Sequence, residues 1–574
     1  MATKTAGKAR RSQLVGTYGV GAIFPAEAES YLICGLDHWY EKAAPVVHEP
    51  RLAAALNVDS FRQPPATERT GVPVVRFPEW HYCPTCRALG EHWRIGDKKR
   101  GRCKQCRVDL VPSRFVACCP AGHIQDFPYF RWLHRQGEAG ARADHRMTIE
   151  ARGQSSSLAD IVLGCSCGVR PRSLEGAMNQ GGLVGVTRCF GERRWLPGSE
   201  DDECEETPRA LQRGSSNVWF PVVRSAISIP SWMDSVPQAI RDHWGMIKNG
   251  TAESLPLLVS MAAPDLSEEE RATIVEAILQ NQDAASDDAV VAEKGLRRQE
   301  YDALKIGRPE SDPGQDFVAR PVAVDESVAS LVAQVMEVPR LREVRALQAF
   351  TRVTPSAGPE DRKRFAPLSE SSPRWLPAVE VLGEGIFLRF DETALSEWEA
   401  TAFAQERTGL VQRAIDRRAV ELDITARPLA PRELLLHTFA HVLLGELSLD
   451  AGYPTSALRE RVYATDEMAG VLIYTASGDA AGSLGGLVAQ SRTDRLAAVL
   501  VSALERATWC TQDPVCIESV GAGAWGLNLA ACHACVLLPE VSCESQNTTL
   551  DRAVLIGTMD GPRDGFFSRI LADR

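Results

Sequence analysis

Two closely spaced cysteine pairs constrain the fold of this chain more than any other feature. They read Cys83-Pro-Thr-Cys86 and Cys103-Lys-Gln-Cys106, with sixteen residues between them. A Cys-x-x-Cys turn directs two thiolates at one ion, and two such turns on facing hairpins complete the tetrahedral four-sulfur shell that Zn²⁺ accepts. A redox Cys-x-x-Cys motif occurs once near a βαβ pattern, whereas this motif is doubled. The spacing therefore predicts a structural zinc site, with two disulfides as the alternative.

The other cysteines also favour metal binding in a reducing compartment. The 574-residue chain has 16 cysteines, most of them in clusters with ligand-like spacing. No signal peptide precedes them, and no window reaches the roughly 18 consecutive apolar residues of a membrane span. We therefore expect a cytoplasmic protein whose thiols are reduced. The length allows about three or four domains.

One segment of this acidic chain is basic. The net charge is −11, yet Lys and Arg outnumber Asp and Glu between His81 and Arg135. The residues between the two cysteine pairs predict a cationic hairpin tip containing Arg94, Lys98, Lys99, Arg100 and Arg102. Contact with nucleic-acid phosphates is one interpretation of this tip, and a solvated loop is the other.

Cysteines that follow this segment predict a second zinc site. The expected ligands are Cys165, Cys167, Cys189 and Cys204. Cys119 and His123, in a Cys-x₃-His spacing, are rivals for a place in it. The alternative is that some of these cysteines are merely buried thiols.

Five cysteines in the C-terminal part predict a third zinc site. The expected ligands are Cys516, Cys532, Cys535 and Cys543. Because a tetrahedral site has four positions, one thiol is spare. We expect this to be Cys510, which lies farthest in sequence from the Cys532-His-Ala-Cys535 turn. Zn²⁺ is thus the expected cofactor of all three sites.

A helix with two histidines permits a different chemistry. Glu433, His437 and His441 recur at i, i+4 and i+8, so one helix face carries three groups that can bind a metal or transfer protons. With Asp479 they suggest a rival function, a metal-dependent nuclease or phosphoesterase. Hydrogen-bonded histidines in a packed helix are the alternative, because this helix is apolar on most sides.

A glycine-rich loop, 475–487, follows a predicted buried strand at 470–474. Its backbone amides can hold a phosphate. No Lys completes a G-x-x-x-x-G-K-[ST] loop, so ATP hydrolysis has no support in the sequence. A tight packing turn between strand and helix is the alternative.

The pattern of apolar residues predicts a mixed α/β multi-domain protein, with zinc-ribbon-like modules inserted in an α+β body. The expected domains are an N-terminal α/β segment (1–80), zinc-binding modules (81–210), a mainly helical region (211–345) and a C-terminal α/β domain ending in a cysteine cluster (346–574). Helices are expected at 50–57, 236–248, 266–282, 289–306 and 396–418. Ser267 and Glu270 predict a capping box on the third of these. Residues 376–390 are expected to form a strand pair hinged at Gly383-Glu-Gly385.

Several motifs follow one another in a fixed order along the chain. They are Arg11-Ser-Gln-Leu with Tyr18-Gly-Val-Gly-Ala, Arg213-Gly-Ser-Ser-Asn217, Leu341-Arg-Glu-Val-Arg345, Gly383-Glu-Gly-Ile-Phe, His437 with His441, Gly482-Ser-Leu-Gly-Gly486, and Cys532, Cys543 and Asn547 with Leu550-Asp-Arg552. In this order they resemble the DrmB family, the helicase-associated subunits of bacterial DISARM anti-phage systems. The C-terminal third is also similar to a cysteine-containing domain that some superfamily 2 (SF2) DNA helicases carry behind their motor.

The resemblance implies a partner for the helicase DrmA in a complex that engages invading DNA, with the ATPase in the partner chain. It transfers no catalytic residue to this sequence. We therefore expect a non-catalytic, zinc-stabilised subunit that docks on an SF2 helicase and supports DNA binding and loading. The basic segment 81–135 is the expected site of phosphate contact.

Overall fold

Two compact units make up the chain in the computed structural model. The structure describes residues 5–66, 71–97, 101–135, 145–153, 157–230, 237, 239–240, 243–247, 250–284, 289–310, 315–356, 358, 361–475 and 485–572. Unit 1 comprises Met1–Ser225 and Arg345–Val379, and unit 2 comprises Ala226–Val344 and Glu380–Arg574. These units divide the chain at other places than the four expected domains, which stay predictions.

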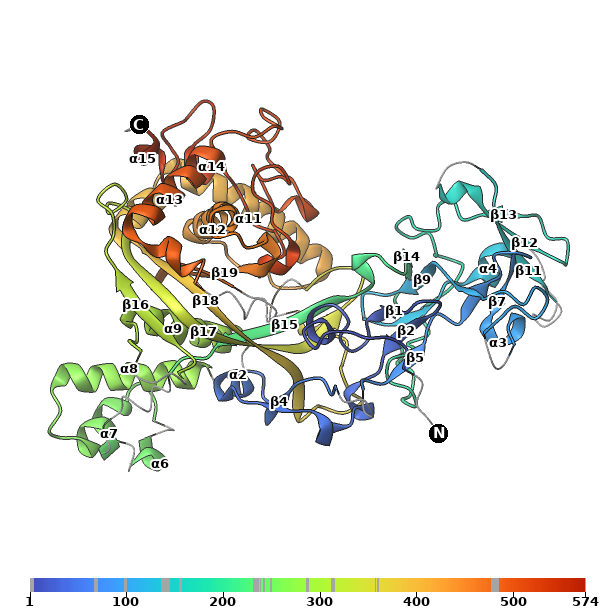
Figure 1. The fold of residues 1–574 in the computed structure, drawn as a ribbon, viewed down its shortest axis with the longest axis horizontal. Coiled ribbons are helices and arrows are strands. Elements are labelled where there is room, and N and C mark those ends of the chain that lie inside the picture. The colour runs from blue at the N-terminus through green and yellow to red at the C-terminus, as the bar shows by residue number, and fades with distance from the viewer. Residues whose placement is uncertain are drawn as a thin grey trace. The chain divides into compact units, whose positions relative to one another are not determined.

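Unit 1 consists of short strands in several small sheets (Figure 1). Its helices are α1 (Gln13–Gly16), α2 (Pro50–Ala55), α3 (His92–Ile95) and α4 (Tyr129–Leu133). Its strands are β1 (Ile23–Pro25), β2 (Ser30–Ile33), β3 (Val46–Val47), β4 (Ser60–Arg62), β5 (Val74–Arg76), β6 (Trp80–Tyr82), β7 (Ala88–Glu91), β8 (Val111–Pro112), β9 (Phe115–Cys118), β10 (Ile124–Asp126), β11 (Met147–Ala151), β12 (Ile161–Cys165), β13 (Arg172–Ser173), β14 (Arg209–Gln212) and β15 (Phe220–Ile227), which ends in unit 2. The sheets have the orders β1-β2-β5, β10-β9-β14 and β13-β12-β11-β7-β6-β8.

A buried arginine fastens the returning segment 345–379 into unit 1. Arg352 is fully buried and donates hydrogen bonds to the carbonyl oxygens of Gly122 at 2.7 Å, Val218 at 2.6 Å and Gly21 at 2.8 Å. Burial lowers its pKa to about 10, so the guanidinium stays charged at neutral pH. The three carbonyls come from segments far apart in sequence, and one side chain therefore holds them together.

Unit 2 is a long-stranded sheet covered by helices. Its helices are α6 (Trp244–Ile247), α7 (Leu255–Ala262), α8 (Glu268–Ala284), α9 (Ala289–Ile306), α10 (Glu392–Glu399), α11 (Ala402–Leu422), α12 (Pro431–Ala451), α13 (Thr493–Ala507), α14 (Ala553–Ile556) and α15 (Ser568–Ala572). Its strands are β16 (Val318–Val322), β17 (Val332–Thr351), β18 (Trp375–Phe390), β19 (Leu458–Thr465) and β20 (Met468–Thr475), of which β17 and β18 also contribute residues to unit 1. The order is β15-β17-β18-β20-β19, with β16 paired to β17.

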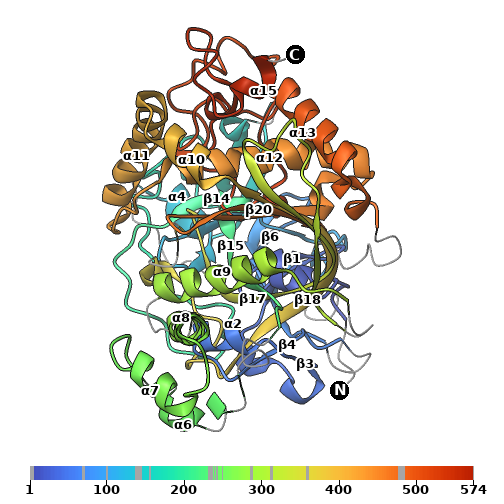
Figure 2. The ribbon, with the colours of Figure 1, turned by 90° about the vertical axis from the view of Figure 1, so that its left-hand side faces the viewer.

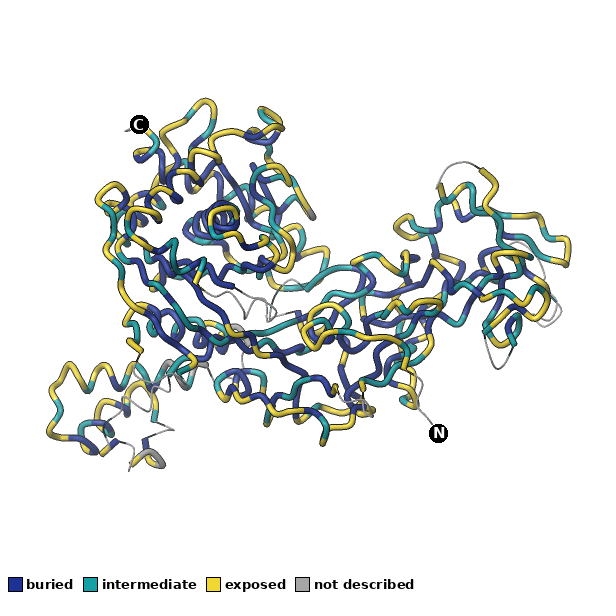
Figure 3. Tube along the Cα trace, viewed as in Figure 1, coloured by how far each residue is buried: buried dark blue, intermediate teal, exposed yellow. Residues whose placement is uncertain are grey.

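Strand β20 explains why this sheet needs helices on both faces. Every residue of β20 is buried, and the long strands β17 and β18 of the same sheet are largely buried or half-buried too (Figure 3). Val471 and Ile473 pack in the cluster that contains the α12 leucines, whereas Leu472 and Tyr474 pack with Tyr301 of α9. Successive side chains of a strand point to opposite faces, so α12 and α9 cover the two sides of the sheet (Figure 2). The predicted buried strand at 470–474 is confirmed.

Helix α12 lies in the core of unit 2. Among the described residues it is the one helix with the length and composition to cross a membrane, and 78% of that window is buried inside the protein. A helix that is apolar on all sides is expected in a core. Its contacts with β19, β20 and α13 show that the apolar composition serves packing.

The expected strand pair at 376–390 is wrong, because β18 runs through it as one strand of 16 residues. Gly385 lies in regular antiparallel register with Tyr474 of β20. A Cβ atom on Gly383 would lie 2.4 Å from the Thr475 carbonyl oxygen, and one on Gly385 would lie 2.8 Å from that of Ile473. The two glycines therefore permit a close approach of neighbouring backbone and do not form a turn.

The predicted fold class is confirmed, since several sheets and helices alternate along the chain. The helix at 289–306 matches α9, and the capping box of α8 is formed: Glu270 donates its N–H to Ser267 Oγ at 3.2 Å, and Ser267 donates its own to the Glu270 carboxylate at 2.8 Å. The helix expected at 396–418 is two helices, α10 and α11. In its described part, the region 211–345 has all its α-helical residues between Ala239 and Ile306, and β15, β16 and β17 flank them.

Candidate metal centres

Metal-binding side chains gather in five groups within the part of the chain that the structure describes. In each group, four donor atoms lie within 4.8 Å of one another. They are the ribbon group (Cys83, Cys86, Cys103, Cys106), the Cys119 group (Cys119, His123, Cys189, Cys204), the His134 group (His134, His145, Cys165, Cys167), the Cys510 group (Cys510, Cys516, Cys532, Cys535) and the His437 group (His437, His441, Glu460, Cys543). All 16 cysteines are free thiols, and Cys34 and Cys118 are the two outside these groups.

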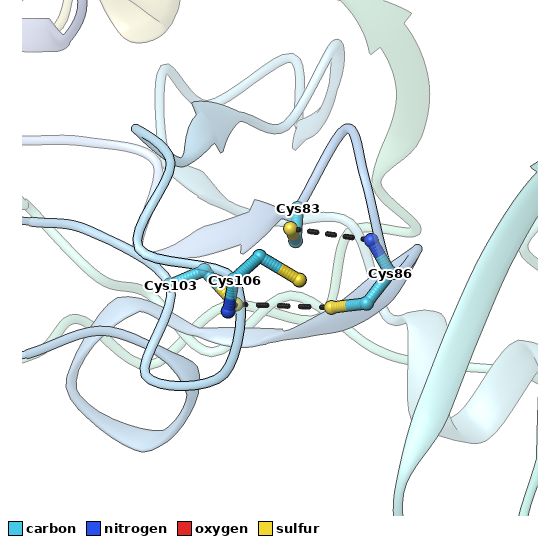
Figure 4. A group of neighbouring side chains, drawn as sticks. All are labelled: Cys83, Cys86, Cys103 and Cys106. Atoms are coloured by element: carbon cyan, nitrogen blue, oxygen red, sulfur yellow. Dashed lines mark hydrogen bonds between the residues drawn. The ribbon is translucent and has the colours of Figure 1, made fainter.

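Two equivalent turns build the ribbon group from the four cysteines expected there. The Cys86 amide nitrogen lies 3.4 Å from Cys83 Sγ, and the Cys106 amide nitrogen lies 3.5 Å from Cys103 Sγ. An N–H directed at sulfur favours the thiolate. The Sγ atoms of Cys86 and Cys103 are 3.7 Å apart, and all four side chains turn toward one centre (Figure 4). This arrangement offers four soft donors to one tetrahedral ion.

The basic tip between these turns is described only in part. Lys98, Lys99 and Arg100 lie outside the described residues. Arg94 forms an ion pair with Glu91 at 3.5 Å, and Arg102 forms one with Asp109 at 3.0 Å. These carboxylates reduce the positive potential that Arg94 and Arg102 present to a phosphate.

The hairpin of β9 and β10 supplies the first two donors of the Cys119 group. Cys119 Sγ lies 3.4 Å from His123 Nδ1 and 4.0 Å from Cys204 Sγ. His123 Nε2 lies 2.8 Å from a carboxylate oxygen of Asp202, which leaves Nδ1 turned toward the sulfurs. A hydrogen bond from Cys119 outweighs burial and lowers the pKa of Cys189 to about 4. The thiolate is the form that binds a metal.

Two histidines complete the His134 group. The register of β11 and β12 pairs Met147 with Cys165, which brings His145 beside the end of β12. Cys165 Sγ lies 3.3 Å from His145 Nδ1, and Cys167 Sγ lies 3.4 Å from His134 Nε2. His134 follows α4, so a helix end and a hairpin together provide the four donors.

The expected single set of Cys165, Cys167, Cys189 and Cys204 is corrected, because the structure divides it between the two groups. Its members lie near different sheets: Cys165 ends β12, whereas Cys189 and Cys204 lie in the segment that precedes β14, the strand paired with β9. The rivals Cys119 and His123 both join the second pair. His134 and His145 were not expected. The hairpin register of β11 and β12 is the signal that identifies His145.

The Cys510 group is also composed differently from the expectation. Cys510 Sγ lies 3.5 Å from Cys532 Sγ, and Cys516 Sγ lies 3.7 Å from Cys535 Sγ. Cys510 is therefore not spare, since it follows the end of α13 and is delivered directly to the Cys-x-x-Cys turn. Cys543 lies in the His437 group instead.

Two consecutive charged residues anchor the loop that carries the Cys510 group. Asp551 is fully buried and accepts two hydrogen bonds from the guanidinium of Arg407, at 2.7 and 2.8 Å. Arg552 donates to the Asp513 carboxylate at 2.6 Å and to the Ala507 carbonyl at 2.8 Å. Paired charges of this kind tolerate burial, whereas a single one does not.

The His437 group is buried at all four positions. His437 Nε2 lies 3.0 Å from Glu460 Oε1 and 3.3 Å from Cys543 Sγ, and His441 Nε2 lies 3.3 Å from Glu460 Oε1. Burial alone lowers the pKa of a histidine, but the Glu460 carboxylate overrides it. The pKa of His437 is raised well above its ordinary value, and that of His441 is raised to about 9. Despite burial, the two imidazoles hold the pKa of Glu460 far below its ordinary value.

The helix-face constellation of the rival enzyme is not assembled. The carboxylate of Glu433 forms a two-point ion pair with Arg427, at 2.6 and 2.9 Å, and is not a member of the His437 group. Asp479 lies outside the described residues. Glu460 on β19 lies beside the two histidines, in the place that the rival enzyme would give to Glu433.

The amides at the end of the glycine-rich loop already have an anionic partner from the protein itself. Gly485, Leu487 and Val488 donate their N–H groups to the Glu384 carboxylate at 2.7, 2.9 and 3.3 Å. Tyr453 Oη donates to the same carboxylate at 2.9 Å. In the described part of the loop, an internal glutamate therefore occupies the position that a phosphate could take, and the amides serve packing between segments of the chain.

Two protein families match parts of this chain. Residues 10–220 match a domain of unknown function (DUF8724), and residues 439–536 match the MrfA Zn-binding domain. The chain is also 30% identical over 571 residues to the DISARM protein DrmB of Bacillus paralicheniformis, an alignment that covers 95% of this chain and 99% of that protein. The Zn-binding domain match and the cysteine groups confirm Zn²⁺ as a cofactor of this chain.

Proposed function

The chain belongs to the DrmB family of DISARM proteins, and from this premise we propose that it is a non-catalytic, zinc-stabilised subunit of an anti-phage defence complex. Its partner is a DrmA-like SF2 helicase, which supplies the ATPase. The chain docks on this helicase in the cytoplasm and supports DNA binding and loading.

The observation that carries this proposal is that four of the five groups each hold a complete set of donors. These are the ribbon, Cys119, His134 and Cys510 groups, here called the four cysteine-rich groups. Each offers four protein donors, which fill a tetrahedral Zn²⁺ and leave no position for water or substrate. Such closed shells are typical of structural zinc. We accordingly assign as ligands Cys83, Cys86, Cys103 and Cys106; Cys119, His123, Cys189 and Cys204; His134, His145, Cys165 and Cys167; and Cys510, Cys516, Cys532 and Cys535.

Zinc in these positions replaces the apolar cores that such small lobes lack. A structural Zn²⁺ contributes on the order of 10 kcal/mol of apparent folding free energy. The net stability of a whole domain is about 5–15 kcal/mol. Four such ions therefore keep loop-rich segments rigid enough to present a fixed surface to a partner.

A purified full-length chain is expected to hydrolyse neither DNA nor ATP when supplied with Mg²⁺, Mn²⁺ or Zn²⁺. When the helicase partner is added, ATP hydrolysis is expected. When a helicase variant without its catalytic residues is added instead, no ATP hydrolysis is expected. Metal-dependent cleavage of DNA by the chain alone would contradict the proposal and favour the nuclease or phosphoesterase.

Charge reversal at the ribbon tip is expected to weaken DNA binding by the complex. Replacing Lys98, Lys99 and Arg100 by glutamate removes three cations, so both the affinity and the slope of log affinity against log salt concentration should fall, the latter by about 2–3. Fluorescence anisotropy at several salt concentrations measures both quantities, and zinc content should not change.

A matched control places three glutamates elsewhere. Arg413, Arg417 and Lys305 are exposed residues of unit 2, and their replacement makes the same change in net charge. An equal loss of DNA affinity in both triple variants would show that the loss comes from the change in net charge and not from the tip. Unchanged affinity in the tip variant would show that the tip is only solvated.

A further inference from the structure

We propose that His437, His441, Glu460 and Cys543 form a fifth Zn²⁺ site, a closed mixed-donor centre inside the core of unit 2. It differs from the four cysteine-rich groups in having two nitrogen donors, one oxygen and one sulfur. The match to the MrfA Zn-binding domain spans residues 439–536 and so includes neither His437 nor Cys543. The site goes beyond the proposed function, because its existence does not depend on any partner.

Three separate elements bring these donors together. His437 and His441 are one turn apart on α12, and their ring centroids are 4.7 Å apart. Glu460 comes from β19 and Cys543 from the loop after the Cys510 group. No donor residue is more than 4% exposed: His437 is 3%, His441 1%, Glu460 1% and Cys543 4% exposed.

The backbone fixes both imidazoles in the orientation that a metal requires. His437 Nδ1 donates to the Thr549 carbonyl at 3.3 Å, and His441 Nδ1 donates to the Val536 carbonyl at 3.0 Å. The Nε2 atom of each ring therefore faces Glu460. A ligand histidine usually donates its other N–H to a carbonyl or carboxylate in this way.

The spacing of the donor atoms fits a tetrahedral ion. Glu460 Oε1 lies 3.0 Å from His437 Nε2 and 3.3 Å from His441 Nε2, and Cys543 Sγ lies 3.3 Å from His437 Nε2. Zn²⁺ bonds of about 2.0–2.3 Å to nitrogen, oxygen and sulfur correspond to ligand separations of about 3.3–3.7 Å. Small shifts of the side chains are sufficient to surround an ion.

Two of these polar atoms have no hydrogen-bond partner. His441 Nε2 and Glu460 Oε2 are buried without one, although His441 Nε2 lies close to the other carboxylate oxygen. Buried polar groups are nearly always satisfied, so an orphaned pair in a packed core calls for a missing component. A cation between the four side chains satisfies both atoms.

The charge balance selects a divalent cation. One carboxylate and one thiolate together carry two negative charges, and the two imidazoles are neutral when they act as ligands. A divalent ion makes the buried site neutral. Among divalent metals, a set of two imidazoles, one thiolate and one carboxylate in a tetrahedron suits Zn²⁺.

The zinc content of the full-length Cys543→Ser variant tests this site. Native mass spectrometry of the wild-type chain is expected to give five Zn²⁺ per chain, one for each group. Cys543→Ser is expected to lose one of them. Cys34→Ser, which changes another buried thiol outside every group, is the matched control and should lose none. The test compares the number of Zn²⁺ per chain in the variant with that in the wild type. The result therefore does not depend on how fully the other groups are occupied.

A folded Cys543→Ser variant with the wild-type zinc count would overturn the proposal. If that variant does not fold, crystals of the wild-type chain provide the answer through anomalous scattering at the zinc absorption edge. A peak between His437, His441 and Glu460 supports the site. Peaks at the cysteine-rich groups with none at this position would contradict it.

Discussion

Replacing Cys535 by serine is expected to remove one Zn²⁺ and to unfold the loop that carries the Cys510 group. Four thiolates from Cys510 to Cys535 hold this loop, and 3-10 turns are its only helical structure in the described residues between α13 and α14. Loss of the ion removes on the order of 10 kcal/mol of apparent folding free energy, comparable to the stability of a whole domain. Zinc analysis and limited proteolysis of the purified protein measure the two effects.

Ala534→Ser is the matched control for this variant. Ala534 is exposed in the same turn, one residue before Cys535, so the control adds a serine without removing a donor. It should keep the full zinc content and resist protease as the wild type does. If Cys535→Ser keeps its zinc, the assignment of the Cys510 group fails. If it loses zinc but resists protease, the metal does not stabilise this loop.

Replacing Asp551 by alanine is expected to destabilise unit 2 by about 3–5 kcal/mol, because it leaves a buried guanidinium without its partner. The carboxylate of Asp551 accepts two hydrogen bonds from Arg407 and one each from the backbone N–H groups of Ala530 and Ala553. All of these donors lose their acceptor together. Chemical denaturation followed by fluorescence measures the change in the free energy of unfolding.

Two comparisons separate this effect from a general cost of removing an aspartate. Asp59 pairs with Arg374 at 2.8 Å, but these side chains are 62% and 88% exposed, so Asp59→Ala should cost no more than about 1 kcal/mol. The double variant Arg407→Leu with Asp551→Leu should cost less than Asp551→Ala alone, since it leaves no unpaired charge. An equal cost for Asp59→Ala and Asp551→Ala would refute the burial argument.

Features that depend on residues close in sequence are predictable for this chain. The ribbon group is two copies of one local turn, and its four cysteines come together as expected. The capping box of Ser267 and Glu270 is likewise formed within one helical turn. In both cases the chemistry and the geometry are specified within a few residues, so no knowledge of the tertiary structure is required.

Groups built from distant segments could not be predicted in the same way. Spacing along the chain suggested that Cys510 was spare and that Cys543 was a ligand beside Cys535. In the structure, the end of α13 brings Cys510 to Cys535, and the following loop brings Cys543 to the His437 group. Glu460 resembles one of the charged residues of an ordinary strand until β19 is placed against α12. The identity of such partners depends on which sheet or helix each segment joins.

Glycines and buried charges show the same limit. Gly383 and Gly385 suggested a turn, yet both lie within β18. Glycine is needed at these two positions because the neighbouring backbone leaves no room for a Cβ atom. Glu384 between them is buried, and its carboxylate accepts hydrogen bonds from amides that were candidates for phosphate contact. The Gly-Glu-Gly motif showed that this position is structurally special, but it did not show why. The reason is a contact between segments about a hundred residues apart.

Affinity purification of the tagged full-length chain, co-expressed with a DrmA-like SF2 helicase, tests the central claim most directly. The measured quantities are the helicase-to-chain ratio and the zinc content of the complex after size-exclusion chromatography. The helicase is expected to co-elute with a zinc-loaded chain, and Cys535→Ser is expected to lose one Zn²⁺ and the helicase. A folded, zinc-loaded chain that elutes without the helicase would contradict the claim.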